Sequence, residues 1–170
     1  IGGETIRSVS MRILATFILS ASLVSTGASA FDLEHLKQLK ETNACSKCDL
    51  SDADLSDLDL AKAIINRTNL SGANLSGANL MFANLVGSRL IGANMTETNL
   101  SAANVSGANM KGANLTDAKL IRARLRGANL AETNLTGTNM KGANLSDITQ
   151  DNAILCNTVM PDGTVIRTGC

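Results

Sequence analysis

Apolar residues return at every fifth position along most of this chain. All but one of the 23 successive centres from Leu50 to Met160 are apolar, and Gln150 is the exception. The residue two positions before the centre is small except at Leu58 and Ile148, and it is Ala in 14 of the 23 units. A period of five fits neither the helical period of about 3.6 residues nor the strand period of about 2. The pattern therefore predicts a structure in which every unit repeats the same local turn.

Each unit reads Ala-Asn-Leu-x-Gly in its commonest form. The Ala and Leu positions share a face, as alternate residues of a strand do. The two residues that follow Leu are often Ser-Gly, and these are turn formers. A chain that turns repeatedly in one direction becomes a coil stacked on itself, with the large and small side chains filling a narrow interior column.

Covering segments are expected at both ends, because an open column exposes apolar side chains and unpaired backbone groups. Before the repeat, Leu33, Leu36 and Leu39 follow a candidate cap at Asp32, which predicts a short amphipathic helix. After the repeat, the turn signal at 161–163 precedes an extended segment at 164–166 that we expect to fold back over the last coil. These features divide the chain into an N-terminal capping segment at 31–47, a solenoid at 48–160 and a C-terminal cap at 161–170.

The region before residue 31 has the pattern of a signal peptide. A positive start at Met11-Arg12 leads into an apolar run at 13–24 and small residues at Ala28-Ser29-Ala30. We assign residues 11–30 to the signal peptide and treat residues 1–10 as an upstream extension outside the fold. Export to the bacterial periplasm is the first prediction, with the thylakoid lumen and the extracellular space as alternatives. No membrane anchor is expected after cleavage, because the apolar run is shorter than the roughly 20 residues of a membrane span.

The run of Ala-(Asp/Asn)-Leu-x-x units from Ala53 to Asp147 resembles the pentapeptide-repeat family. This resemblance implies an all-β fold, a right-handed quadrilateral β-helix with four units per coil. The repeat would then form five to six coils, between the short capping helix and the C-terminal cap.

Four cysteines lie near the two ends of the repeat, and export would favour disulfides. With the coil that the resemblance implies, the two ends lie roughly 25 Å apart, beyond the limit of about 7 Å between bridged Cα atoms. We therefore predict Cys45–Cys48 and Cys156–Cys170, and no zinc site shared by all four. Redox chemistry at Cys45-Ser46-Lys47-Cys48 is the alternative to a structural disulfide there.

No recognisable enzyme site is present in the sequence. His35 is the one histidine, and Phe17, Phe31 and Phe82 are the only aromatic residues. The recurring serines and glycines follow the turns of the repeat, so they indicate neither a nucleophile nor a phosphate loop. We expect no catalytic residue, no cofactor and no metal ion.

Two groups of outward residues depart from the repeat and form a candidate partner surface. The apolar group consists of Met81, Phe82, Val86 and Ile91. The cationic group consists of Lys119, Arg122, Arg124 and Arg126. Isolated surface apolar residues and a solvated charge group are the structural alternatives.

The leading hypothesis is a non-enzymatic, exported structural or protein-interaction module that acts as a monomer on an unidentified protein partner. The alternative is a DNA mimic that inhibits a type II topoisomerase, as acidic rods of this family do. Residues 32–59 carry eight acids and three bases, whereas residues 60–170 carry ten bases and six acids. Only the first coil is therefore acidic, and we expect no nucleic acid among the partners.

Overall fold

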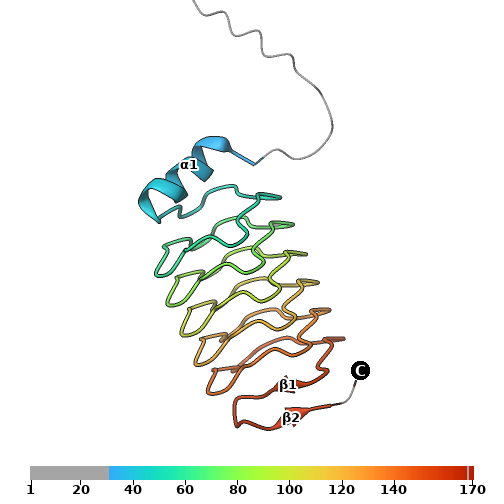
Figure 1. The fold of residues 1–170 in the computed structure, drawn as a ribbon. Helices are drawn as coiled ribbons and strands as arrows, with labels where there is room; N and C mark the ends of the chain where they lie inside the picture. Colours follow the sequence, from blue (N-terminus) through green and yellow to red (C-terminus); the bar gives the residue numbers. More distant parts are fainter. Residues whose placement is uncertain (1–30, 168) are drawn as a thin grey trace, which may run out of the picture.

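The computed structural model describes residues 31–167 and 169–170, which form a stack of coils between a short helix and a two-stranded hairpin (Figure 1). Helix α1 covers Leu33–Thr42, strand β1 covers Thr158–Val159 and strand β2 covers Val165–Ile166. The predicted extension at 1–10 and the predicted signal peptide at 11–30 lie outside the described residues.

Four units make one coil, because each unit pairs with the unit twenty residues further along the chain. The parallel bridges run from Ala44 with Ile64 to Asn139 with Val159. One residue per unit forms a bridge, so the described coils contain isolated bridges and no long strands. The ladder starts one unit before the predicted boundary at 48, because Cys45 takes a centre position and its N–H donates to Ile64 O at 2.8 Å.

All five N–H groups of a typical unit have an acceptor. In the unit 73–77, the N–H groups of Asn74, Leu75 and Gly77 donate to carbonyls of neighbouring coils at 2.9, 2.7 and 2.9 Å. The N–H of Ala73 closes the preceding turn at 3.1 Å. The N–H of Ser76 donates to Oδ1 of Asn74 at 3.3 Å. The Asn that precedes each centre therefore caps the corner that follows it, and this explains why it recurs.

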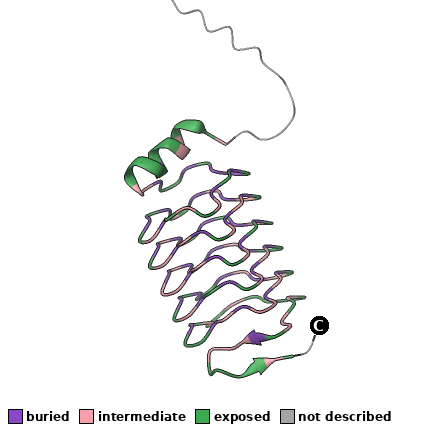
Figure 2. Cartoon of the chain, viewed as in Figure 1, coloured by how far each residue is buried: buried purple, intermediate pink, exposed green. Residues whose placement is uncertain are grey.

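The interior column consists of the centres and the small residues two positions before them (Figure 2). Leu75 and Leu100 are fully enclosed, as are the Ala residues at 73 and 103. Several small positions hold Thr or Ser, and their buried hydroxyls bond to carbonyls of the preceding coil. Thr98 Oγ1, for example, donates to Leu75 O at 2.7 Å. These residues add polar groups to the core without leaving their hydroxyls unpaired.

Helix α1 covers the first coil. The side chain of Asp32 accepts a hydrogen bond from Glu34 N at 2.9 Å and caps the helix, as predicted. Leu39 is 1% exposed, and Leu36 packs partly against the core, but Leu33 is 71% exposed. The expectation that Leu33 shares the buried face is wrong, because each three-residue step falls about 60° short of a full turn. Leu33 and Leu39 consequently point in directions about 120° apart.

The C-terminal hairpin folds back on the last coil. β1 and β2 pair antiparallel, with Thr158 opposite Ile166 and Val159 opposite Val165. The turn between them contains Asp162, whose carboxylate accepts bonds from the N–H and the hydroxyl of Thr164 at 2.9 and 2.7 Å. The extended segment expected at 164–166 is thus present in part as β2.

Asp49, Asp54 and Asp59 of the first coil take the place of the corner-capping Asn. The hydroxyl and then the N–H of Ser51 lower the pKa of Asp49 from its ordinary value, and Ser56 does the same for Asp54. A lowered pKa in the folded state means that the ionised carboxylate is favoured by folding. Its contribution to stability is present above the ordinary Asp pKa of about 3.9 and is lost as the pH falls through the lowered folded value.

We therefore expect the Asp49→Asn/Asp54→Asn double variant to lose less thermal stability than the wild type between pH 7 and pH 2. Asn keeps the Oδ1 acceptor that caps the corner in the other units but does not titrate. Thermal melting by circular dichroism at several pH values measures the difference. Parallel melting profiles for the two proteins would contradict this account of the first coil.

Candidate interaction surface

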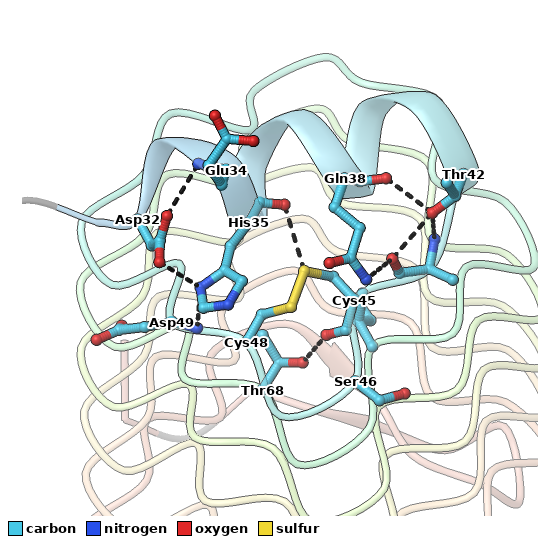
Figure 3. Close-up of a disulfide and its surroundings, with 12 residues drawn as sticks. Asp32, Glu34, His35, Gln38, Thr42, Cys45, Ser46, Cys48, Asp49 and Thr68 are labelled. Atoms are coloured by element: carbon cyan, nitrogen blue, oxygen red, sulfur yellow. Dashed lines mark hydrogen bonds and ion pairs between the residues drawn. A yellow bond between two sulfur atoms is a disulfide. The ribbon is translucent and has the colours of Figure 1, made fainter.

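The Cys45–Cys48 disulfide lies beneath helix α1 at the start of the first coil (Figure 3). The two Cα atoms are 5.5 Å apart. The side chains are almost fully enclosed, with exposures of 0% for Cys45 and 5% for Cys48. Cys45 Sγ also lies 3.3 Å from the carbonyl oxygen of His35, a contact without a hydrogen bond because a disulfide sulfur carries no proton.

His35 belongs to the contact between α1 and the first coil. Its Nδ1 accepts the N–H of Asp49 at 3.2 Å, which places the ring proton of this tautomer on Nε2. Asp32 Oδ2 lies 3.4 Å from the same Nδ1, but an acceptor nitrogen cannot also serve as the charged donor of an ion pair. The backbone bond fixes the ring, because the direction of the Asp49 N–H is set by the main chain.

The burial of Cys45 and Cys48 bears directly on the redox interpretation. Thiol–disulfide exchange requires an attacking thiolate to reach one sulfur of the pair. Helix α1 and the first coil cover both sulfurs here. This arrangement supports the structural role, in which the bridge holds the first corner below the capping helix.

The second disulfide joins Cys156 to Cys170, with a Cα separation of 4.9 Å. It ties the end of the chain, beyond β2, to the last coil. The structure thus contains the two pairings predicted from the sequence. No group of three His, Cys, Asp or Glu side chains in the described part of the chain is arranged to hold a metal ion.

A surface hollow follows one corner of the stack. Backbone bonds run down this corner from coil to coil, including Phe82 N to Ser101 O at 3.0 Å and Arg122 N to Lys141 O at 3.0 Å. The hollow has a volume of about 620 Å³. We call it the corner groove, and its lining residues are Met81, Phe82, Ser101, Ala102, Ile121, Arg122, Lys141, Gly142 and Pro161.

The structure divides the predicted apolar group among three corners. Met81 and Phe82 lie in the corner groove, where Phe82 is 58% exposed. Val86 belongs to the ladder of the next corner, through the bond from Arg67 N to its carbonyl. Ile91 belongs to the corner after that, because it accepts from Gly72 N. These four residues therefore do not form one patch.

The predicted cationic group surrounds the corner groove more closely. Arg122 lines it, while Lys119 and Arg124 occupy the bridge positions on the two faces that meet at this corner. Arg126 lies at the next corner and forms a salt bridge with Asp147 at 3.3 Å.

The sequence predicted Met81, Phe82 and Arg122 of the corner groove but none of its other lining residues, of which Ile121 and Lys141 have long side chains. Ile121 is two coils from Met81, and Lys141 is one coil further. Steps of 20 residues along the sequence would have placed them beside Met81 and Phe82. The five-residue period alone does not show which units share a corner.

The coil geometry defines a repeat solenoid, and comparison with known families identifies which one. A family model described as "Pentapeptide repeats (8 copies)" matches the chain at three overlapping ranges, residues 45–81, 78–117 and 108–147. The chain belongs to the pentapeptide-repeat family. The family and its solved structures imply the quadrilateral β-helix for these coils.

Solved structures of the same fold are similar to this chain. The pentapeptide repeat protein Rfr23 from the cyanobacterium Cyanothece 51142 is 30% identical, with a TM-score of 0.69 over 71% of this chain and 96% of that protein. A pentapeptide repeat protein from the Arabidopsis thaliana thylakoid lumen is 23% identical over 66% of this chain and 68% of its own, with a TM-score of 0.29.

The fluoroquinolone resistance protein QnrB1 is 19% identical over 74% of this chain and 80% of its own, with a TM-score of 0.31. The low TM-scores of QnrB1 and the lumenal protein do not carry their location or activity over to this chain. No curated protein sequence matches the chain.

The two bridge cations beside the corner groove replace corner-capping residues. In most units Asn or Asp at this position accepts the N–H two residues later, as Asn99 does from Ser101 at 3.1 Å. Lys119 and Arg124 have no side-chain oxygen, so they cannot offer this bond to the N–H groups of Ile121 and Arg126. Both cations therefore occupy positions where Asn would serve the fold better.

We expect Lys119→Asn and Arg124→Asn each to raise the free energy of unfolding by roughly 0.5–1 kcal/mol, the usual value of one net hydrogen bond. Chemical denaturation monitored by circular dichroism measures the change. Arg89→Asn is the matched control, because Arg89 occupies the same bridge position on another face and should show a similar gain. Loss of stability in all three variants would show that the capping argument is wrong.

Proposed function

We propose that this protein is a non-enzymatic, exported interaction module that presents the corner groove to a protein partner. One observation carries the proposal: bulky apolar and cationic departures from the repeat meet at a single corner, whereas most other positions hold residues that serve the coil. Binding residues that depart from a repeat while the fold is preserved are typical of solenoid proteins, which recognise partners through extended surfaces.

The rigidity of the coils supports this role. Backbone bonds of 2.8–3.0 Å join successive coils along the corner itself, from Phe82 N to Gly142 N. The outward side chains are therefore held at constant spacing before any partner arrives. A surface that is already ordered loses less conformational entropy on binding than a flexible one.

The two disulfides support export, because such bonds persist in oxidising compartments. The predicted signal peptide at 11–30 would direct the chain there. In the described residues no helix combines the length and the hydropathy needed to cross a bilayer. We propose the periplasm as the location, with the thylakoid lumen and the extracellular space as alternatives. We also propose that the protein is a monomer and that its coil has the right-handed sense of its family.

The charge distribution favours this function over DNA mimicry. The acidic residues gather in the first coil, where Asp49, Asp54 and Asp59 hold successive bridge positions. Arg89, Lys119 and Arg124 hold bridge positions further along the stack. A DNA mimic needs negative charge over a long surface, and no such surface extends beyond the first coil.

Capture of the partner in the source organism tests the proposed function. The full chain, with an affinity tag after Cys170, is cross-linked in cells and recovered from the extracytoplasmic fraction. We expect one protein to co-purify in a constant ratio and to be displaced by excess untagged chain. Recovery of the tagged chain alone, or its strong inhibition of topoisomerase supercoiling in vitro, would contradict the proposal.

A further inference from the structure

The corner groove owes its hollow to the order of side chains down the corner. Met81 and Phe82 occupy one coil, Ser101 and Ala102 the next, and Ile121 and Arg122 the third. Coils are spaced by about 4.8 Å, so two bulky pairs about 10 Å apart flank a small pair. The volume of about 620 Å³ lies in the range of ligand pockets and exceeds what one large side chain needs. The walls of this hollow are apolar on the side of Met81 and Phe82.

The corner groove is positively charged, and its cations are available to bind an anion. Lys111 is paired with Glu132 at 3.2 Å, and Arg126 is paired with Asp147 at 3.3 Å. Within 31–167 and 169–170, neither Arg122 nor Lys141 belongs to a salt bridge.

Among the residues that the structure describes, no carboxylate lines the corner groove. Asp162 follows Pro161 at its lower end, but its carboxylate already accepts two bonds from Thr164.

Two bulky side chains of the corner groove occupy left-handed backbone positions. Phe82 and Arg122 have φ angles of 60° and 57°, in the region that glycine occupies in many other units. Non-glycine residues on other corners, such as Arg67, share this conformation, so it does not by itself single out the groove. What distinguishes Phe82 is a bulky aromatic ring, more than half exposed, at a position where large side chains are uncommon.

We propose that the corner groove binds an acidic segment of a partner protein, which places one large apolar side chain in the hollow and carboxylates against Arg122 and Lys141. This inference rests on the proposed function and names the chemistry of the partner. A guanidinium and an ammonium on neighbouring coils match two carboxylates of an extended peptide. The apolar wall supplies the burial that a purely electrostatic contact lacks.

The apolar hollow separates this partner from other anions. Nucleic acids are bound by many phosphate contacts, typically 6–10. Arg122 and Lys141 line the corner groove, and Lys119 and Arg124 lie on the adjoining faces, which is fewer cations than such a contact uses. The hollow between Phe82 and Ile121 suits one large side chain of a short peptide better than the headgroups of a membrane.

Fluorescence anisotropy with three labelled nonapeptides tests the proposal. The first alternates glutamate and leucine, the second lysine and leucine, and the third glutamate and serine. We expect the full chain to bind the glutamate–leucine peptide at least tenfold more tightly than either of the others. Binding should weaken with added salt, because both cations are exposed.

Two variants and a matched control locate the site. Arg122→Gln/Lys141→Gln and Phe82→Gly should each weaken binding of the glutamate–leucine peptide at least tenfold, and glycine is favoured at position 82 so the second variant keeps its fold. Arg67→Gln should bind like the wild type. Arg67 has the same φ of 57°, and its stem lies over Gly87 as that of Arg122 lies over Gly142, but it belongs to another corner.

Equal binding of the three peptides, or unchanged binding by both groove variants, would overturn the proposal. Tighter association with phosphatidylglycerol vesicles than with the peptide would also overturn it, by assigning the cations to a membrane. These outcomes differ from failure of the proposed function, which would appear as no captured protein in cells. A partner captured equally by wild type and groove variants would leave the module in place and refute only the groove.

Discussion

The bonding of each coil to the coil twenty residues further on is the constraint from which the other features follow. A typical unit sends three N–H groups to neighbouring coils, one to its own turn and one to the side chain of the preceding Asn. That arrangement demands a left-handed residue after every corner, such as Gly77 at φ 67°. It also leaves an interior only wide enough for one large and one small side chain per unit. The backbone bonding therefore explains why the Ala-Asn-Leu-x-Gly pattern recurs.

Much of this architecture is readable from the sequence, because the period of five is unbroken from Leu50 to Met160. The interior column, the cap at Asp32 and the two disulfide pairings follow from it or from the family resemblance. The columns of outward residues do not, since self-similarity at 20 residues is no stronger than at five. That is why Val86 and Ile91 were grouped with Phe82, although the structure places them on other corners. The exposed Leu33 was misplaced because a three-residue spacing drifts around a helix.

The residues that depart from the repeat can be related to function only when their positions on the coils are known. Phe82 and Arg122 place large side chains on one corner, and Lys119 and Arg124 lie on the faces that meet there. All four lie at or beside the same corner. Single departures such as Arg67 and Arg89 occur on other corners, so the gathering of apolar and cationic side chains is what distinguishes this one. The regular coils hold these side chains at fixed spacing for a partner.

The central claim is that the repeated residues stabilise the coils, while the residues that depart from the repeat at one corner bind the partner. The most direct measurement is partner capture by a chain whose corner is returned to the repeat, with Met81→Ser, Phe82→Gly, Ile121→Ser, Arg122→Gly and Lys141→Ser. These replacements are residues that other corners already hold, so the coils should remain intact. The account predicts that this folded variant captures less than about a tenth of the partner bound by the wild type, the loss that removal of a central hot spot typically produces. Capture equal to that of the wild type would contradict it.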